Sequence, residues 1–209
     1  MMIANNQKPG WSFYLGWVVL NSIAIVAAGL ISLGLIILIT QIVGDTIQVA
    51  GQSRITEDFL FMYVLFPVIG LLTGLLQYLL LRRYFPRLTG WIPATFLGWL
   101  MPFITGYFIV TVLGFDNDTF SLMLGLLLIG ATVAVPQWWL LRQRVHHAFW
   151  WILAGGLGWG LVGLLNLVTS EPLPVLLALA LLPAIATGIA FWLLLDWYPK
   201  QQLQSSAGY

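Results

Sequence analysis

The sequence predicts an all-α integral membrane protein with six transmembrane helices, arranged as three parallel two-helix repeats in a pseudo-threefold bundle. Composition predicts the membrane: 60% of the 209 residues are hydrophobic and only 7% are charged, which lies far outside the range of soluble domains. Six long apolar runs predict the number of helices. An internal repeat predicts how these helices are arranged.

Net charge and cysteine content exclude several classes of function. The formal net charge is +1, so no basic surface for nucleic acid is indicated and we expect no nucleic acid as a partner. The chain has no cysteine. It can therefore form no disulfide, no thiolate metal site and no thiol nucleophile.

Each of the six apolar segments is long enough to cross a bilayer, which takes about 20 residues of helix. The segments are residues 12–43, 59–82, 91–114, 119–142, 149–169 and 173–196. The first is long enough to tilt or to extend beyond the bilayer. Because the intervening loops are short, we expect one transmembrane domain over residues 1–209 and no soluble domain.

Loops with mainly acidic residues alternate along the chain with loops that carry mainly basic residues. The acidic loops contain Asp45, Glu57, Asp58, Asp116, Asp118 and Glu171, with Arg54 as the one basic residue among them. The other loops and the tails contain Lys8, Arg82, Arg83, Arg87, Arg142, Arg144 and Lys200. Because lysine and arginine are retained on the cytoplasmic side, we expect both termini in the cytoplasm. All eleven tryptophans then fall in the cytoplasmic halves of their helices, which a two-sided interfacial belt does not explain.

The internal repeat matches residues 70–99 to residues 130–159 without a gap. The repeated unit consists of a helix, a cytoplasmic turn and the next helix. Glycine or another small residue recurs four positions apart in every unit, which predicts close helix packing. Matched pairs include Gln77 with Gln137, Arg82 with Arg142, Trp91 with Trp151, and Trp99 with Trp159.

Two units are continuous, in residues 59–114 and 119–169, and the third is split between the ends of the chain, in residues 173–196 and 12–43. If the split unit assembles like the others, the last helix lies beside the first and closes a ring. In this unit our alignment places Phe191 where the glutamine is expected, with Trp192 next to it and Trp17 in the position of Trp99.

The two glutamines are the candidate functional residues. At about 1.5 Å of rise per residue, Gln77 and Trp99 lie at similar depths on paired helices, as do Gln137 and Trp159. An unpaired amide in hydrocarbon is costly, so we predict a structural clasp in which each glutamine bonds to the indole at its level. The alternative is that the glutamines and these tryptophans line a ligand pocket. A site of that kind is expected first in the one different wedge of the ring, with Trp17, Phe191 and Trp192.

No catalytic constellation is visible in the sequence. Every ionisable residue lies at or beyond a helix end, which disfavours a proton-coupled pump. Neither paired carboxylates nor a serine, histidine and acid set can be assembled. His146 and His147 are adjacent in a loop, so we expect no metal centre within the bundle. We therefore expect no enzymatic activity and no required cofactor, although a lipid or a pigment is allowed.

The repeated motifs G-x-x-x-G-x-x-Q-[YW]-x-L-L-R and W-[IV]-x-A-x-x-x-G-W resemble a group of bacterial multi-pass membrane proteins that is frequent in cyanobacteria. The resemblance implies a bacterial plasma or thylakoid membrane and brings no established activity. Its residues are Gly70, Gly74, Gln77, Tyr78, Arg82, Trp91, Ala94, Gly98 and Trp99, with a second copy from Gln137 to Trp159.

Three functions remain open. The first is a non-enzymatic accessory, scaffold or assembly subunit of a larger membrane complex, with other membrane proteins as partners. The second is a small-solute transporter or substrate-capture component, and the third is a binder of lipid, quinone or pigment. In all three we expect Arg82 and Arg142 to contact lipid headgroups. A packed interior favours the first function, a central cavity the second, and a lateral apolar groove the third.

Overall fold

The computed structural model consists of helices and one β-hairpin, and all six predicted segments are helical. The residues described are 10–49, 51–84, 88–112, 119–145, 147–169 and 171–206. The helices are α1 (Trp11–Val43), α2 (Thr56–Leu81), α3 (Trp91–Val112), α4 (Thr119–Leu141), α5 (Trp150–Val168) and α6 (Pro172–Ser206). The strands are β1 (Thr46–Val49) and β2 (Gln52–Ile55).

The protein is a multi-pass membrane protein. Within the described residues, five helices, all except α3, contain a stretch long and apolar enough to cross a membrane, and α3 adds a further helix of 22 residues. Large apolar side chains cover the outward faces, for example Leu30, Val168 and Leu173, each more than 60% exposed. Such a surface is stable in contact with lipid chains.

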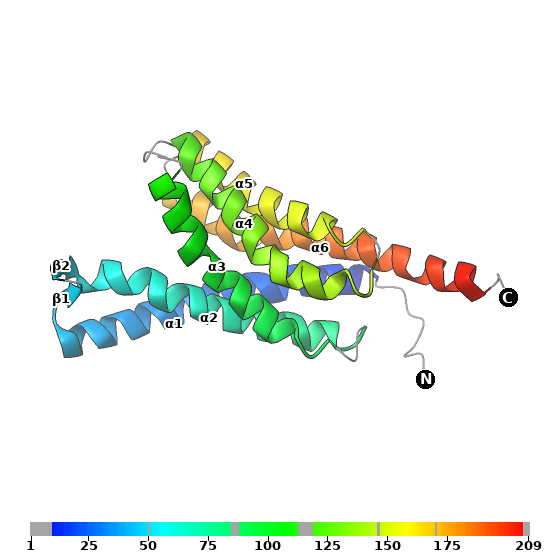
Figure 1. Cartoon of the computed structure of the whole chain (residues 1–209), viewed down its shortest axis with the longest axis horizontal. Coiled ribbons are helices and arrows are strands. Elements are labelled where there is room, and N and C mark those ends of the chain that lie inside the picture. Colours follow the sequence, from blue (N-terminus) through cyan, green and yellow to red (C-terminus); the bar gives the residue numbers. More distant parts are fainter. Residues whose placement is uncertain are drawn as a thin grey trace.

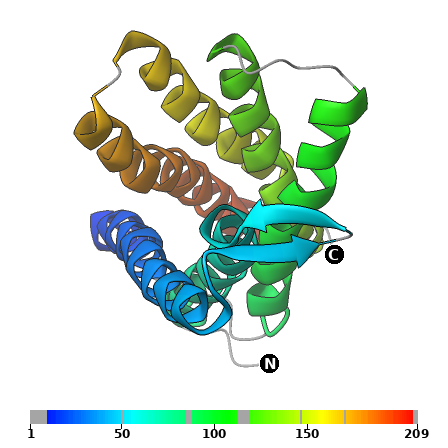
Figure 2. The ribbon, with the colours of Figure 1, turned by 90° about the vertical axis from the view of Figure 1, so that its left-hand side faces the viewer.

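The helices form a closed ring. Each helix packs against its neighbours in chain order, and α6 packs against α1, as expected from the split repeat (Figure 2). The first turn of α1 and the last turn of α6 lie at one end of the bundle together with the last turns of α2 and α4, whereas the β-hairpin lies at the opposite end (Figure 1). We refer to these as the terminal end and the hairpin end.

A short hairpin, which we did not predict, joins α1 to α2. Its strands are antiparallel, with Thr46 opposite Ile55, and Gly51 adopts a φ of +79° next to the tip. At the base, the Thr56 hydroxyl donates to the carbonyl of Gly44 at 2.6 Å, and the Thr56 amide donates to the carbonyl of Asp45 at 2.9 Å. These bonds fix the start of α2 against the end of α1.

Glycines allow the backbones to approach closely within the ring, as the small-residue spacing predicts. A methyl group on Gly98 would overlap the carbonyl oxygen of Val133 on α4. One on Gly158 would lie 2.7 Å from the Cα of Pro183 on α6, and one on Gly130 would lie 2.8 Å from the Cβ of Trp159. Side chains at these positions would push neighbouring helices apart.

We predict that Gly98→Ala destabilises the protein by about 1–3 kcal/mol, because the added methyl group has no space beside Val133. Gly29→Ala on α1 is the matched control, since nothing lies within 4 Å of its added methyl group. Alanine favours a helix by up to about 1 kcal/mol over glycine, so the control should be neutral or slightly stabilising. Thermal unfolding in detergent measures both effects, and equal losses in the two variants would contradict the predicted packing.

Candidate functional site

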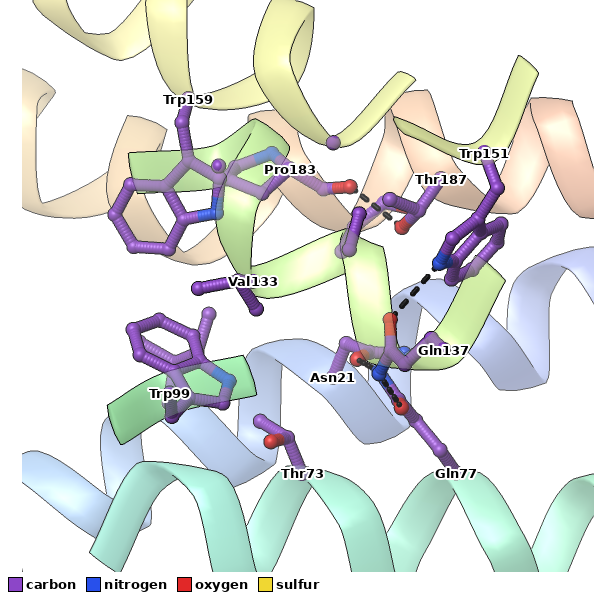
Figure 3. A pocket seen from close by; sticks show the side chains of 15 residues that line it. Asn21, Thr73, Gln77, Trp99, Val133, Gln137, Trp151, Trp159, Pro183 and Thr187 are labelled. Carbon is purple, nitrogen blue, oxygen red and sulfur yellow. Dashed lines mark hydrogen bonds between the residues drawn. The ribbon is translucent and has the colours of Figure 1, made fainter. Parts of the chain in front are cut away.

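The interior of the bundle contains a connected set of amide side chains, which are the candidate site. Gln77, Gln137 and Asn21 are each less than 9% exposed. Gln77 Nε2 donates to Asn21 Oδ1 at 2.6 Å, and Gln137 Nε2 donates to Gln77 Oε1 at 3.2 Å. The amides thus link α1, α2 and α4 directly (Figure 3).

Each glutamine also accepts a hydrogen bond from the first turn of the following helix. Trp91 Nε1 donates to Gln77 Oε1, and Trp151 Nε1 donates to Gln137 Oε1, both at 2.9 Å. Gln137 Nε2 donates in addition to the Thr95 hydroxyl at 2.8 Å. The two copies of the repeat therefore use the glutamine carbonyl in the same way, and the network reaches α3 and α5.

Each glutamine bonds to an indole, but the indoles are those of Trp91 and Trp151, and the clasps predicted with Trp99 and Trp159 are wrong. Close contacts show the register of the helical pair α2–α3: a methyl group on Gly70 would lie 3.0 Å from the Cβ of Trp99, and one on Gly74 would lie 3.1 Å from the Cβ of Thr95. Trp99 is therefore level with Gly70, almost two helical turns from Gln77. Residue counts placed Gln77 and Trp99 at similar depths, and the close approach at the two glycines shows a different register.

Trp99 and Trp159 instead contact each other across the interior. Their rings pack edge to face with centroids 5.4 Å apart. Trp99 is buried and Trp159 is half-buried. The pair forms a second aromatic layer, closer to the hairpin end than the amides (Figure 3).

The α1–α6 pair has a related contact in which threonine replaces glutamine. Trp17 Nε1 donates to the Thr187 hydroxyl at 3.1 Å, and this hydroxyl donates to the carbonyl of Pro183 at 2.6 Å. Trp17 thus corresponds to Trp91 and Trp151 rather than to Trp99. The sequence alignment, which placed Phe191 at the glutamine position and Trp17 at that of Trp99, was therefore shifted by four residues in α6 and by eight in α1.

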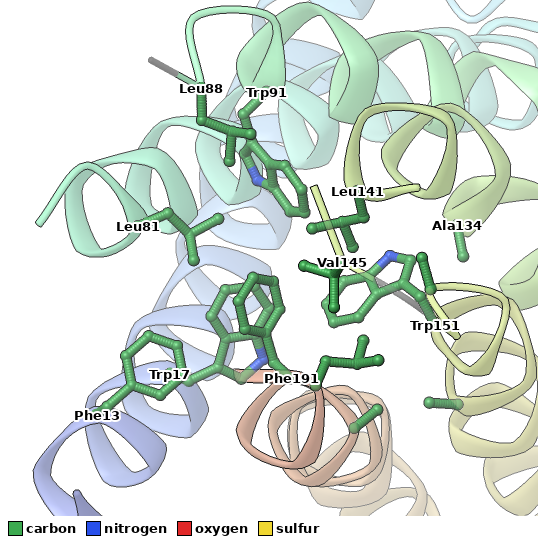
Figure 4. Packing of buried hydrophobic residues seen from close by; sticks show 14 residues of the cluster. Phe13, Trp17, Leu81, Leu88, Trp91, Ala134, Leu141, Val145, Trp151 and Phe191 are labelled. Carbon is green, nitrogen blue, oxygen red and sulfur yellow. The ribbon is translucent and has the colours of Figure 1, made fainter. Parts of the chain in front are cut away.

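A buried aromatic cluster closes the terminal end of the bundle beside the amides (Figure 4). The Phe191 ring lies 5.2 Å from Trp17 and 5.2 Å from Trp151, and the Trp91 and Trp151 rings are 6.0 Å apart. These four side chains are at most 1% exposed. The concentration of tryptophan at one end therefore reflects a core of closely packed rings, mostly edge to face, in addition to surface anchors.

A cavity of about 50 Å³ lies between the amides and the second aromatic layer. Gln77, Gln137, Asn21, Thr73 and Thr187 contribute polar groups to its wall. A water molecule occupies about 30 Å³ in the liquid, whereas sites for small organic ligands have about 300–1,000 Å³. The cavity can hold one or two waters and is too small for an organic solute.

The predicted pocket residues Phe191 and Trp192 point to different faces of α6, one toward the interior and one toward the surface. Phe191 belongs to the buried cluster, whereas Trp192 is 40% exposed and stacks on Trp11 at 6.0 Å. Together with Tyr14 and Ile189, these two tryptophans line an outer groove of about 270 Å³ between α1 and α6. The larger open space at the α1–α6 pair therefore lies on the outer surface of the bundle.

Arg82 and Arg142 are exposed at the terminal end, as predicted from their loops. The guanidinium of Arg142 lies over the Trp139 ring, 3.4 Å from its centroid, and 5.1 Å from that of Trp138. Among the residues that the structure describes, no group of three or more histidine, aspartate or glutamate side chains could hold a metal ion.

We predict that Gln77→Leu and Trp91→Phe are coupled in a double-mutant cycle, by about 0.6–1.7 kcal/mol as for other hydrogen bonds inside membranes. The matched cycle combines Gln77→Leu with Trp99→Phe and should be additive within about 0.5 kcal/mol, because these side chains are not bonded. Unfolding free energies in detergent give both values. Stronger coupling to Trp99 would restore the pairing predicted from the sequence.

Comparisons with known proteins found no matching family model, no curated protein and no solved structure with significant similarity to the chain. The resemblance to cyanobacterial-type membrane proteins stays a prediction. The geometry of the bundle is therefore the basis for the function proposed below.

Proposed function

We propose that the protein is a non-enzymatic accessory, scaffold or assembly subunit of a larger membrane complex. The observation that carries this proposal is the packed interior, in which the buried amides bond to one another and the central cavity measures only about 50 Å³. A packed interior of this kind favours a function at the outer surface of the bundle.

The aromatic cluster adds to the case against a central pathway. The rings of Trp17, Trp91 and Trp151 fill the terminal end and are fully buried. A solute would have to displace these rings and break the hydrogen bonds from each indole to Thr187, Gln77 and Gln137. The transporter or substrate-capture alternative therefore requires a large rearrangement of the bundle.

The half of α1 nearer the hairpin end, beyond Gly29, is the surface best suited to a protein partner. α1 has 33 residues and is about 50 Å long, whereas the hydrocarbon core is about 30 Å thick. Beyond Gly29 only Ser32 and Ile36 are buried, while Leu30, Leu33 and Leu38 are all more than half exposed. A long apolar helix beside an exposed hairpin offers contacts both within and outside the membrane.

A second candidate function is binding of a lipid, quinone or pigment at the outer groove. The groove of about 270 Å³ between α1 and α6 favours it, because three of its four lining residues are aromatic. Such rings pack well against an acyl chain, an isoprenoid chain or a flat ring. This function does not exclude the first, since a bound lipid can form part of a contact with a partner.

We further propose a bacterial plasma or thylakoid membrane, a pseudo-threefold arrangement of parallel repeats, and cytoplasmic termini. Equivalent contacts at Gln77 and Gln137 support the repeats. Arg82 and Arg142 at the terminal end, with Asp45 and Glu171 at the other, support the orientation by the positive-inside rule.

Isolation of intact complexes tests the accessory function. Native membranes solubilised in mild detergent are analysed by native mass spectrometry and by absorption spectroscopy of the same sample. We expect an assembly that contains the 23.3 kDa chain and at least one other membrane protein in fixed ratio. A lone chain or homo-oligomer with a stoichiometric small molecule would instead support the second candidate.

Cysteine labelling tests the orientation, because the wild-type chain has no cysteine. We expect Ser53→Cys in the hairpin to react with an impermeant maleimide in intact cells. Gln143→Cys in the α4–α5 turn should react only after the cells are permeabilised. Both positions are exposed, so the reverse pattern would place the termini outside.

A further inference from the structure

The guanidinium of Arg142 lies over the ring of Trp139 at the terminal end of α4, with Trp138 also in contact range. Its guanidinium lies 3.4 Å from the centroid of Trp139 and 5.1 Å from that of Trp138, and Trp139 is 52% exposed. Stacking on an aromatic face restricts the guanidinium, while its N–H donors remain in the plane of the group and point away from the ring. The arrangement presents a pre-oriented pair of donors at the membrane surface.

We propose that Arg142, oriented by Trp139, binds the phosphate of an anionic phospholipid headgroup. The guanidinium matches a phosphate through two parallel hydrogen bonds. The exposed Trp139 indole is suited to the interface where headgroups meet acyl chains. This site is independent of the accessory function proposed above and of the outer groove between α1 and α6.

The distribution of charge favours an anion at this end. Arg82, Arg83, Arg142 and Arg144 are exposed at the terminal end. The acidic residues whose side chains are described lie at the hairpin end: Asp45, Glu57, Asp58 and Glu171. The 23 residues of α4 put about 35 Å between the two ends, far beyond the screening length of about 8 Å in physiological salt. These four acidic residues therefore lie too far away to pair with Arg142.

The repeat provides an internal comparison for this site. Arg82 follows α2 as Arg142 follows α4, and both are exposed. At the positions that match Trp138 and Trp139, the first copy has Tyr78 and Leu79. Arg82 thus has the same charge and place in the sequence without the double indole support. We therefore expect stronger lipid binding at Arg142 than at Arg82.

Native mass spectrometry of the purified full chain tests this proposal, with phosphatidylglycerol and phosphatidylcholine of identical acyl chains as probes. We expect one phosphatidylglycerol to bind more tightly than phosphatidylcholine. Arg142→Gln should weaken it at least about fivefold, the effect of one basic residue near an anionic surface, while Arg82→Gln should change it much less. Trp139→Leu should weaken it roughly two- to fivefold, the effect of an exposed cation–π contact.

The reciprocal substitution Leu79→Trp guards against effects of misfolding. It should strengthen a second phosphatidylglycerol site at Arg82, which no loss of folding can produce, and circular dichroism checks the fold of all variants. Inorganic phosphate distinguishes a lipid site from a site for free phosphate, because it should not displace the lipid at millimolar concentration. Displacement by phosphate, equal binding of the two lipids, or equal effects of Arg82→Gln and Arg142→Gln would each overturn the proposal.

Discussion

The hydrogen bonds of Gln77 are the interaction on which the arrangement of the helices depends. The side chain lies on α2, donates to Asn21 on α1, and accepts from Trp91 on α3 and Gln137 on α4. One amide thereby connects four of the six helices at a single level. No water is available in the hydrocarbon core to replace a missing partner, so a helix that moved away would leave buried polar atoms unpaired.

The polar network and the close packing of the backbones require each other. The bonds of Gln77 form only in the register in which Gly70 faces Trp99 and Gly74 faces Thr95. Conversely, apolar helices in lipid gain little from burying apolar area against one another, so small residues alone permit several registers. With the register fixed by the amides, the aromatic rings fill the remaining space and leave a cavity of about 50 Å³. This filled interior is the reason to look for function on the outer surface.

Most of the fold could be predicted because it follows from local properties of the sequence. The length of each apolar run set the helices to within a few residues, apart from α6, which continues to Ser206. The split repeat placed α6 beside α1. The partner of Gln77 could not be predicted from residue counts, because the register of a helical hairpin depends on side-chain contacts such as those at Gly70. The β-hairpin was missed because its strands are four residues each and carry no long apolar pattern, although Thr46, Ile47, Val49 and Gly51 gave a weak signal.

The energies involved indicate that the amides serve specificity more than stability. Hydrogen bonds between helices in membranes contribute only about 0.6 kcal/mol on average, whereas an unpaired polar group in an apolar environment costs several kcal/mol. The gain from the correct arrangement is small, and the penalty for a wrong one is large. At the α1–α6 contact, where the two helices are not joined by a turn, Thr187 takes the role of glutamine and forms one bond to Trp17. The Ser22 hydroxyl on α1 also donates to the carbonyl of Ala180 on α6 at 3.0 Å, so two hydrogen bonds restrain this contact. The groove on its outer side is the space that a lipid or a partner can occupy without breaking them.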